Sequence, residues 1–357
     1  MRLLDRYIAR SCVGGIVVAM AALAALDVFF AFVQEIPDIG RGSYGVPQAL
    51  GFVLFTIPRR IYELFPTTAL VGTLLSLGAL AAGSELATMR SAGVPVSRIA
   101  MGAVVGAALV LVPVILLGEF VAPAAENHAL QLRVTAQSQH LTVRLRSGLW
   151  VREGDTVIHA RRLLSGGRLL GLTLYEFKPD QLELNSVSRA RSAEFKGDHW
   201  LLSGFHRSEI RPEGIVTGRE REQRWDSLIG PELLDMLVAE PERLSVWDLE
   251  RYLRYLEENR LDASRYQVAL WGKLIFPVSA LAMVFLGVPF AFGPLRSGGI
   301  AQRMFAGIVI GVTFMILAQI VRHTAEVWAV PPFAAAALPT LLMVLLGSWG
   351  IRRVGRT

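Results

Sequence analysis

The chain has 357 residues, of which 53% are hydrophobic and only 18% are charged. A mean hydropathy of +0.45 is too high for a soluble protein of this size, so we expect a membrane protein. The net charge is +6, but residues 124–265 carry 21 Lys and Arg against 22 Asp and Glu. The positive excess therefore belongs to the apolar remainder, which excludes a basic nucleic-acid patch, and no nucleic-acid partner is expected.

The sequence also lacks the patterns of common catalytic and metal sites. Cys12 is the only cysteine, so no intrachain disulfide is possible. The six histidines do not have metal-ligand spacing, and no metal is expected. Neither a phosphate-binding G-x-x-x-x-G-K-[ST] loop nor a G-x-S-x-G nucleophile turn occurs. We therefore expect no catalytic residue and no cofactor in this chain, and it should not hydrolyse ATP itself.

The first third of the chain predicts three membrane helices. The apolar run 11–34 is longer than the ~7–15-residue core of a signal peptide, which favours a retained spanning helix. The segment 48–82 contains Pro58 and Pro66, which should kink it, and its first part is expected to lie at the membrane interface. A third helix is predicted over 98–121.

A short polar stretch separates the second and third helices. Ser84 and Glu85 are typical of a helix start, with the Ser84 hydroxyl as the predicted cap, and Gly93 is typical of a helix end. Leu86 and Met89 then share one face of a helix too short to span a bilayer. From these residues alone, a docking element for a partner protein and an ordinary surface loop are equally good interpretations.

Residues 124–265 have a different pattern. Six short runs of alternating residues lie between turn sequences and predict an all-β sandwich. The runs are 149–152, 156–161, 169–177, 182–190, 199–210 and 215–225. Two helical pieces, 230–239 and 245–258, are expected after them.

Three further spans are predicted, over 267–292, 302–321 and 332–351. The fold class is therefore a polytopic α-helical membrane protein with six transmembrane helices and an inserted all-β domain. Its predicted parts are helices 1–3 in 1–123, the β domain in 124–265, and helices 4–6 in 266–357. Lys and Arg near the helix ends place both termini in the cytoplasm and the large domain on the far side, the periplasm of a two-membrane cell.

Five motifs occur in a characteristic order along the chain. They are Ser84-Glu-Leu-x-x-Met-x-x-x-Gly93, Gly118-Glu-x-Val-Ala-Pro123, Arg265-Tyr-Gln-x-x-x-Trp-x-Lys273, Phe292-Gly-Pro-Leu-Arg-Ser297 and Pro331-Pro332. With these motifs the chain resembles the lipopolysaccharide export permeases, the LptF/LptG (YjgP/YjgQ) family, over essentially its full length. The Arg-Tyr-Gln and Gly-Pro-Leu-Arg-Ser stretches look most like the LptG branch.

The resemblance implies a multi-pass protein of the inner membrane whose inserted domain is a periplasmic β-jellyroll. Its implied partners are an LptF-like permease, an LptB-like ATPase dimer that binds the ATP, an LptC-like single-span protein and an LptA-like bridge. The implied role is to extract lipopolysaccharide and pass it towards the outer membrane. The stretch 84–93 then becomes a coupling helix that docks on the ATPase. Its candidate residues are Ser84, Glu85, Leu86, Met89, Arg90 and Gly93.

An exported amphiphile with anionic phosphates implies cations and an apolar wall at the outer membrane edge. Six residues are candidates for binding it: Arg41, Arg59, Arg60, Arg133, Phe29 and Phe32. Arg59 and Arg133 match basic positions of the family, whereas the family's lysines at the outer end of helix one are absent here. The alternative for each arginine is contact with lipid headgroups at the interface.

Other residues leave two interpretations open. Leu172, Leu174, Trp200 and Leu202 are either a groove for acyl chains or simply the core of the β domain. Asp27, in the middle of an apolar run, needs a cavity or a partner because a charge there costs roughly 2.5–3.5 kcal/mol.

Two other functions are possible from the sequence. The first is a membrane scaffold that transmits ATPase strokes to a periplasmic partner without moving lipid. The second is a lipid-modifying enzyme, for which Glu119, Glu126 and His128 form the only candidate cluster.

Overall fold

A computed structural model describes residues 3–137, 149–164, 168–178, 183–226, 241–259, 261–292, 300–328 and 330–355. The predicted helix 230–239 and the Gly-Pro-Leu-Arg-Ser motif at 293–297 lie outside these residues. The chain forms two compact units. A helical unit comprises Met1–Arg133 and Ser264–Thr357, and a β unit comprises Val134–Ala263.

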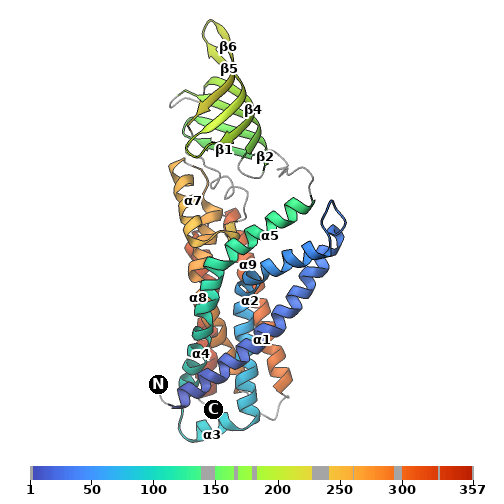
Figure 1. The fold of residues 1–357 in the computed structure, drawn as a ribbon. Coiled ribbons are helices and arrows are strands. Elements are labelled where there is room, and N and C mark those ends of the chain that lie inside the picture. The colour runs from blue at the N-terminus through green and yellow to red at the C-terminus, as the bar shows by residue number, and fades with distance from the viewer. Residues whose placement is uncertain are drawn as a thin grey trace. The chain divides into compact units, whose positions relative to one another are not determined.

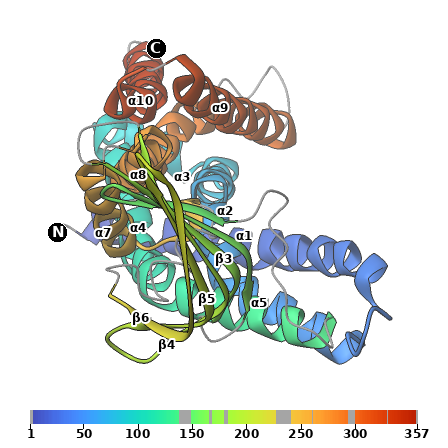
Figure 2. The ribbon, with the colours of Figure 1, turned by 90° about the horizontal axis from the view of Figure 1, so that it is seen from above.

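The helical unit consists of long helices and one short helix, α3 (Figure 1). They are α1 (Leu3–Glu35), α2 (Val46–Ala82), the short α3 (Glu85–Ser91), α4 (Val96–Leu116), α5 (Ala122–Gln137), α8 (Ser264–Ala291), α9 (Ile300–Trp328) and α10 (Pro332–Gly355). Figure 2 shows α8, α9 and α10 together on one side of this unit, with α1 and α5 on the other. The chain is thus a polytopic membrane protein with a β domain inserted between its helices.

Five stretches of the described residues are long and apolar enough to cross a membrane. They are Leu3–Asp38, Val46–Ala82, Val96–Arg133, Ser264–Ala291 and Pro332–Val354. The remaining predicted span, 302–321, corresponds to α9, whose 29 residues extend roughly 43 Å. Its described apolar part is shorter, Ile308–Val321.

Two helices run further than the sequence predicted. α2 is one continuous helix that contains both Pro58 and Pro66 and changes direction along its length (Figure 1). The helix predicted to stop at 121 instead passes through a π-helical turn, Leu117–Val121, and continues as α5. A π turn adds a residue to the helix, so the chain continues as a helix through Pro123.

The crossing of α1 and α2 leaves no room for side chains between the two backbones. A Cβ atom on Gly15 would lie 2.4 Å from the carbonyl oxygen of Gly72, and one on Gly72 would lie 2.3 Å from the Cα of Ile16. The Ser76 hydroxyl also donates a hydrogen bond across the crossing to the Ser11 carbonyl oxygen, at 2.9 Å. Small residues permit this close approach of membrane helices.

α4 crosses α1 in the same way on another side. A Cβ on Gly106 would lie 2.6 Å from the Ala9 carbonyl oxygen, and one on Gly102 would lie 3.0 Å from the Ile8 Cγ2. The Gly102-x-x-x-Gly106 pattern therefore serves packing within this chain. α1 is held between α2 and α4 by backbone contacts.

The β unit contains one antiparallel sheet in which consecutive strands are neighbours. The strands are β1 (Leu149–Glu153), β2 (Thr156–Leu164), β3 (Arg168–Phe177), β4 (Leu184–Phe195), β5 (Trp200–Arg211) and β6 (Gly214–Trp225), followed by α7 (Val246–Glu258). Every predicted strand is present. The described strands make a single sheet rather than the two sheets of a sandwich or jellyroll. The sequence did not predict this, because alternation specifies the buried face of a strand but not how the strands are divided between sheets.

The backbone crossing of α1 and α2 gives a first prediction. We expect Gly15→Ala to lower the free energy of unfolding by about 1–3 kcal/mol, because the new methyl group would force the helices apart. Thermal unfolding of the purified protein in detergent measures this. Gly14→Ala is the matched control, since nothing lies within 4 Å of its Cβ position. Equal losses of stability in the two variants would contradict the prediction.

Candidate functional site

α3 begins with an unusual turn. Ser84 has φ +58°, in the left-handed region that costs about 1–2 kcal/mol for an L residue. Its hydroxyl makes no capping hydrogen bond, so the predicted side-chain cap is wrong. Its carbonyl oxygen instead accepts hydrogen bonds from the backbone N–H and the hydroxyl of Thr88, both at 3.0 Å. The predicted end at Gly93 is confirmed, because Gly93 has φ +84° and its N–H donates to the Arg90 carbonyl oxygen.

The apolar face of α3 points into the helical unit. Leu86 is only 3% exposed and belongs to a core cluster that includes Val96 and Ile99, and Met89 packs against the same cluster. Leu86 therefore anchors α3 to the helical unit. A short helix between two membrane helices buries its apolar side against them, which leaves Ala87 and Thr88 on the exposed side.

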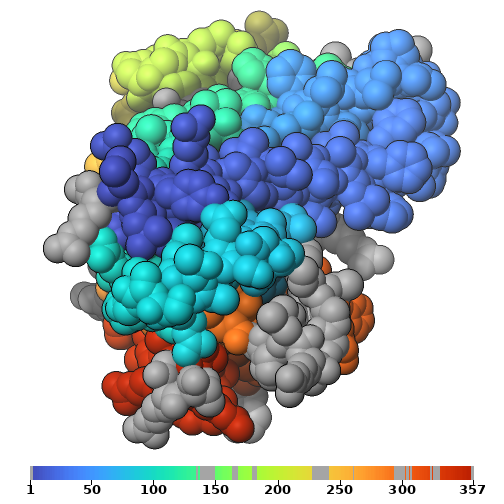
Figure 3. Space-filling model, turned by 90° about the horizontal axis from the view of Figure 1, so that it is seen from below, coloured from blue at the N-terminus to red at the C-terminus, as the bar shows by residue number. Residues whose placement is uncertain are grey.

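Polar contacts tie α3 to the first and last helices of the unit. The Tyr7 hydroxyl of α1 donates to the Glu85 carboxylate at 2.8 Å, and the Arg90 guanidinium donates to the Val354 carbonyl oxygen of α10 at 3.4 Å. Beside them, Arg98 of α4 pairs with Asp5 at 2.9 Å. Figure 3 shows α3 and the first turns of α1 next to each other on one face. Sequence reasoning missed both partners on α1, because no local pattern indicates a pairing across more than 70 residues.

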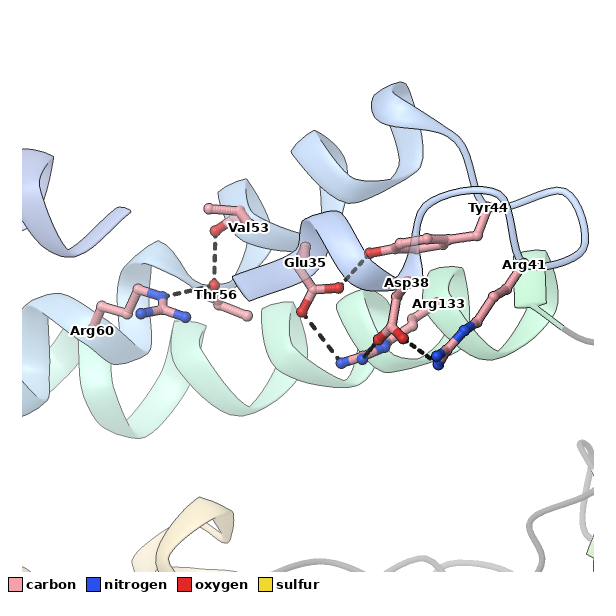
Figure 4. A network of polar contacts seen from close by, with 8 residues as sticks. All are labelled: Glu35, Asp38, Arg41, Tyr44, Val53, Thr56, Arg60 and Arg133. Carbon is pink, nitrogen blue, oxygen red and sulfur yellow. Dashed lines mark hydrogen bonds and ion pairs between the residues drawn. The ribbon is translucent and has the colours of Figure 1, made fainter. Parts of the chain in front are cut away.

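A second polar group lies at the other end of α1 and α2, where α5 runs beside them (Figure 4). We call it the rim network: Glu35, Asp38, Arg41, Tyr44 and Arg133. The Arg133 guanidinium pairs with Glu35 at 3.3 Å and also with Asp38, which pairs with Arg41. The Tyr44 hydroxyl donates to Glu35 at 2.9 Å.

The rim network is electrically balanced. Two arginines face two carboxylates, and the Glu35 side chain is only 9% exposed. Burial, together with the hydrogen bond to Glu35, raises the pKa of Tyr44 to about 12, so its hydroxyl remains a donor at neutral pH. Arg133 also lies over the Phe52 ring, 5.1 Å from its centroid. Arg133 and Arg41 are therefore engaged cations rather than free ones.

The other two predicted cations are also paired. Arg59 contacts Glu63 at 2.6 Å along α2. Arg60 contacts Asp27 of α1 at 2.7 Å and donates to the Thr56 hydroxyl at 3.0 Å. Of the cavity and the partner that the sequence left open for Asp27, the structure shows a partner in the neighbouring helix.

The remaining candidates are distributed over both units. Phe29 is 60% exposed on α1 and Phe32 is partly buried. Leu172, Leu174, Trp200 and Leu202 are all buried within one cluster on the inner face of the sheet. In this structure they form a core, and an acyl chain would reach them only if that core opened.

Two of the residues considered for an enzyme, Glu119 and His128, have structural contacts. Glu119 pairs with Lys273 at 3.1 Å, linking the π turn to α8 with both side chains nearly buried. His128 packs against the Phe55 ring at a centroid distance of 6.2 Å. Among the described residues, no group of three His, Cys, Asp or Glu could hold a metal ion.

Comparison with known proteins completes this picture. The family model described as lipopolysaccharide export system permease LptF/LptG matches residues 6–353. The chain belongs to this family. It is 31% identical over 352 residues to the lipopolysaccharide export system permease protein LptG of Haemophilus influenzae, with 98% of each chain covered. It is also 31% identical over 353 residues to LptG of Escherichia coli strain K12, again with 98% of each chain covered.

The rim network gives a second prediction. We expect Arg133→Met to lower the free energy of unfolding by about 1–3 kcal/mol, because it leaves the buried Glu35 carboxylate short of a partner. Thermal unfolding in detergent is the measurement. Arg41→Met is the matched control: Arg41 is mostly exposed, so its loss should change stability by less than about 0.5 kcal/mol. A larger loss of stability in Arg41→Met than in Arg133→Met would contradict the prediction that Arg133 contributes more to the stability of the rim network.

Proposed function

We propose that this chain is the LptG-type permease subunit of an ATP-driven lipopolysaccharide exporter. It would extract lipopolysaccharide from the inner membrane and pass it to a periplasmic bridge leading to the outer membrane. The observation that carries the proposal is the family match over residues 6–353 on a polytopic helical unit with an inserted β domain. In this proposal both termini are cytoplasmic and the β unit is periplasmic.

The proposed partners are an LptB-like ATPase dimer, an LptF-like permease, an LptC-like single-span protein and an LptA-like bridge. The ATPase would bind ATP and dock on the exposed side of α3, around Thr88. Glu85 connects that surface to Tyr7, and the Gly15–Gly72 crossing connects α1 to α2. Movement of α3 would therefore be transmitted along α1, whose 33 residues extend roughly 50 Å to the rim network.

At that end, substrate binding would be an exchange of ion pairs. Arg41, Arg59, Arg60 and Arg133 are all held by carboxylates in this structure. A lipid phosphate would replace one carboxylate on an arginine, since guanidinium groups bind both anions bidentately. Phe29 and Phe32 would supply the apolar contact for the lipid chains.

The same pairing gives the scaffold function its best support, because a protein that never binds an anionic lipid also needs its cations neutralised. Photo-crosslinking in native membranes distinguishes the two functions. A photo-reactive residue at Thr88 should capture the ATPase, and one at Arg59 should capture lipopolysaccharide. Exposed Leu109 on α4 is the control for general lipid contact. Adducts to the ATPase at 88 with no lipopolysaccharide enrichment at 59 over 109 would favour the scaffold.

A third prediction concerns coupling. We expect Tyr7→Phe, which removes the hydrogen bond to Glu85, to reduce lipopolysaccharide release per ATP hydrolysed by several-fold while ATP hydrolysis continues. The reconstituted exporter, assayed for both quantities, provides the measurement. Tyr175→Phe removes a phenol hydroxyl from the β unit instead and should leave the ratio unchanged. An unchanged ratio in Tyr7→Phe would show that this contact does not transmit movement.

A further inference from the structure

On two strands of the sheet, β3 and β5, the alternation of buried and exposed residues is interrupted by one extra residue. On β3, Leu169 and Leu172 are both buried although two residues lie between them, so Leu170 and Gly171 both belong to the opposite face. On β5, Leu202 and Phe205 are buried in the same way around Gly204. Gly171 and Gly204 have φ +65° and +66°, a conformation that favours glycine. We call the side opposite the apolar core the outer face.

A hollow of about 500 Å³ lies on the outer face beside these two glycines. Four arginines and a histidine line it together with apolar side chains. The lining side chains are Arg161, Arg162, Leu170, Leu172, Thr173, Arg189, Ala190, Arg191 and His206. The arginines come from β2 and β4, which flank β3 and are therefore about 10 Å apart.

The two glycines make space for the arginine side chains. A Cβ on Gly171 would lie 2.9 Å from the Cδ of Arg161, so Arg161 crosses directly over the β3 backbone. A Cβ on Gly204 would lie 3.3 Å from the Cβ of Arg191. Larger residues at these two positions would fill the hollow or displace both arginines.

The described arginines of the hollow have no carboxylate partner, whereas several others of the sheet are ion-paired. Arg207 pairs with Glu176, Arg211 with Glu209, and Arg224 with Asp226, at 2.7–2.9 Å. Arg161, Arg162, Arg189 and Arg191 have no ion pair with any carboxylate in the part of the chain that the structure describes. Four guanidinium groups that have no carboxylate partner among the described residues thus line one hollow.

A row of cross-strand neighbours extends from the hollow along the same face. His159 is opposite Trp150, Thr173 is opposite His159, Arg189 is opposite Thr173, and His206 is opposite Arg189. Trp150 is exposed and stacks on His159 at a centroid distance of 4.2 Å. The row places an aromatic surface, a hydroxyl and imidazoles beside the arginines, which are the groups that contact the ring and the hydroxyls of a sugar.

We infer that this hollow binds a phosphorylated saccharide, with its phosphate on the arginines and its sugar ring along the row towards Trp150. Arginine forks match phosphate oxygens, and the volume is that of a small-molecule site. A concave hollow of this size suits a compact ligand better than the surface of an acidic protein. The inference rests on the proposed function only where the ligand is identified as the sugar part of exported lipopolysaccharide.

Binding of α-D-glucose 1-phosphate to the purified full chain in detergent tests the inference, by isothermal titration calorimetry. We expect the double variant Arg189→Gln with Arg191→Gln to bind at least about tenfold more weakly than the parent, because two charge-assisted contacts are lost. The control is Arg211→Gln with Arg224→Gln, which removes the same charge from ion-paired positions of the sheet. It should bind like the parent. Glucose should not bind, and inorganic phosphate should bind more weakly than glucose 1-phosphate.

Equal binding to the parent and to the Arg189/Arg191 variant would overturn the inference. So would inorganic phosphate binding as tightly as the sugar phosphate, or a decaglutamate peptide that binds more tightly and displaces it. Lipopolysaccharide release by the reconstituted exporter is measured in parallel. Absent release with intact glucose 1-phosphate binding would count against the proposed function and leave the saccharide site standing.

Discussion

The contact of the α1 backbone with those of α2 and α4 is the constraint on which the rest of the helical unit depends. At Gly15, Gly72 and Gly106 one backbone touches another, so no flexible side chain lies between the helices to absorb a displacement. α1 must therefore move together with both neighbours or separate from them completely. Since one end of α1 contacts α3 and the other end enters the rim network, this rigidity links the two polar ends of the unit mechanically.

Charge neutralisation is the second constraint. A charge in an apolar setting is expensive, and two carboxylates within the described helices are paired with cations, Asp27 with Arg60 and Glu119 with Lys273. In the proposed function, an anionic substrate at the rim would therefore exchange with a tethered carboxylate instead of meeting a free cation. Such an exchange changes the net charge little and is readily reversed when the carboxylate returns. A transport site needs that reversibility, because a substrate bound too tightly would not leave.

Most elements could be predicted from the sequence because their signals are local. Hydropathy located the long helices, and alternation located all six described strands within a few residues. The differences arise where distant residues meet. Leu86 is buried in the core cluster of the helical unit, Arg133 is held by the link after α1, and the helix after Val96 continues through a π turn. Spacing within a segment shows that Leu86 and Met89 share a face, but it does not show which neighbour that face contacts.

The same principle explains why identical side chains behave differently in the two units. Water around the exposed sheet solvates an unpaired guanidinium at little cost, whereas the partly buried Arg133 at the end of the helices is held by carboxylates. Arg161, Arg162, Arg189 and Arg191 retain their full capacity for an anion, while Arg133 must first release one. Among the described arginines, those best prepared to bind a phosphate therefore lie on the β unit. In a permease family named for lipopolysaccharide, the unpaired arginines that suit a sugar phosphate therefore belong to the β unit, and the apolar surfaces that suit a lipid belong to the helical unit.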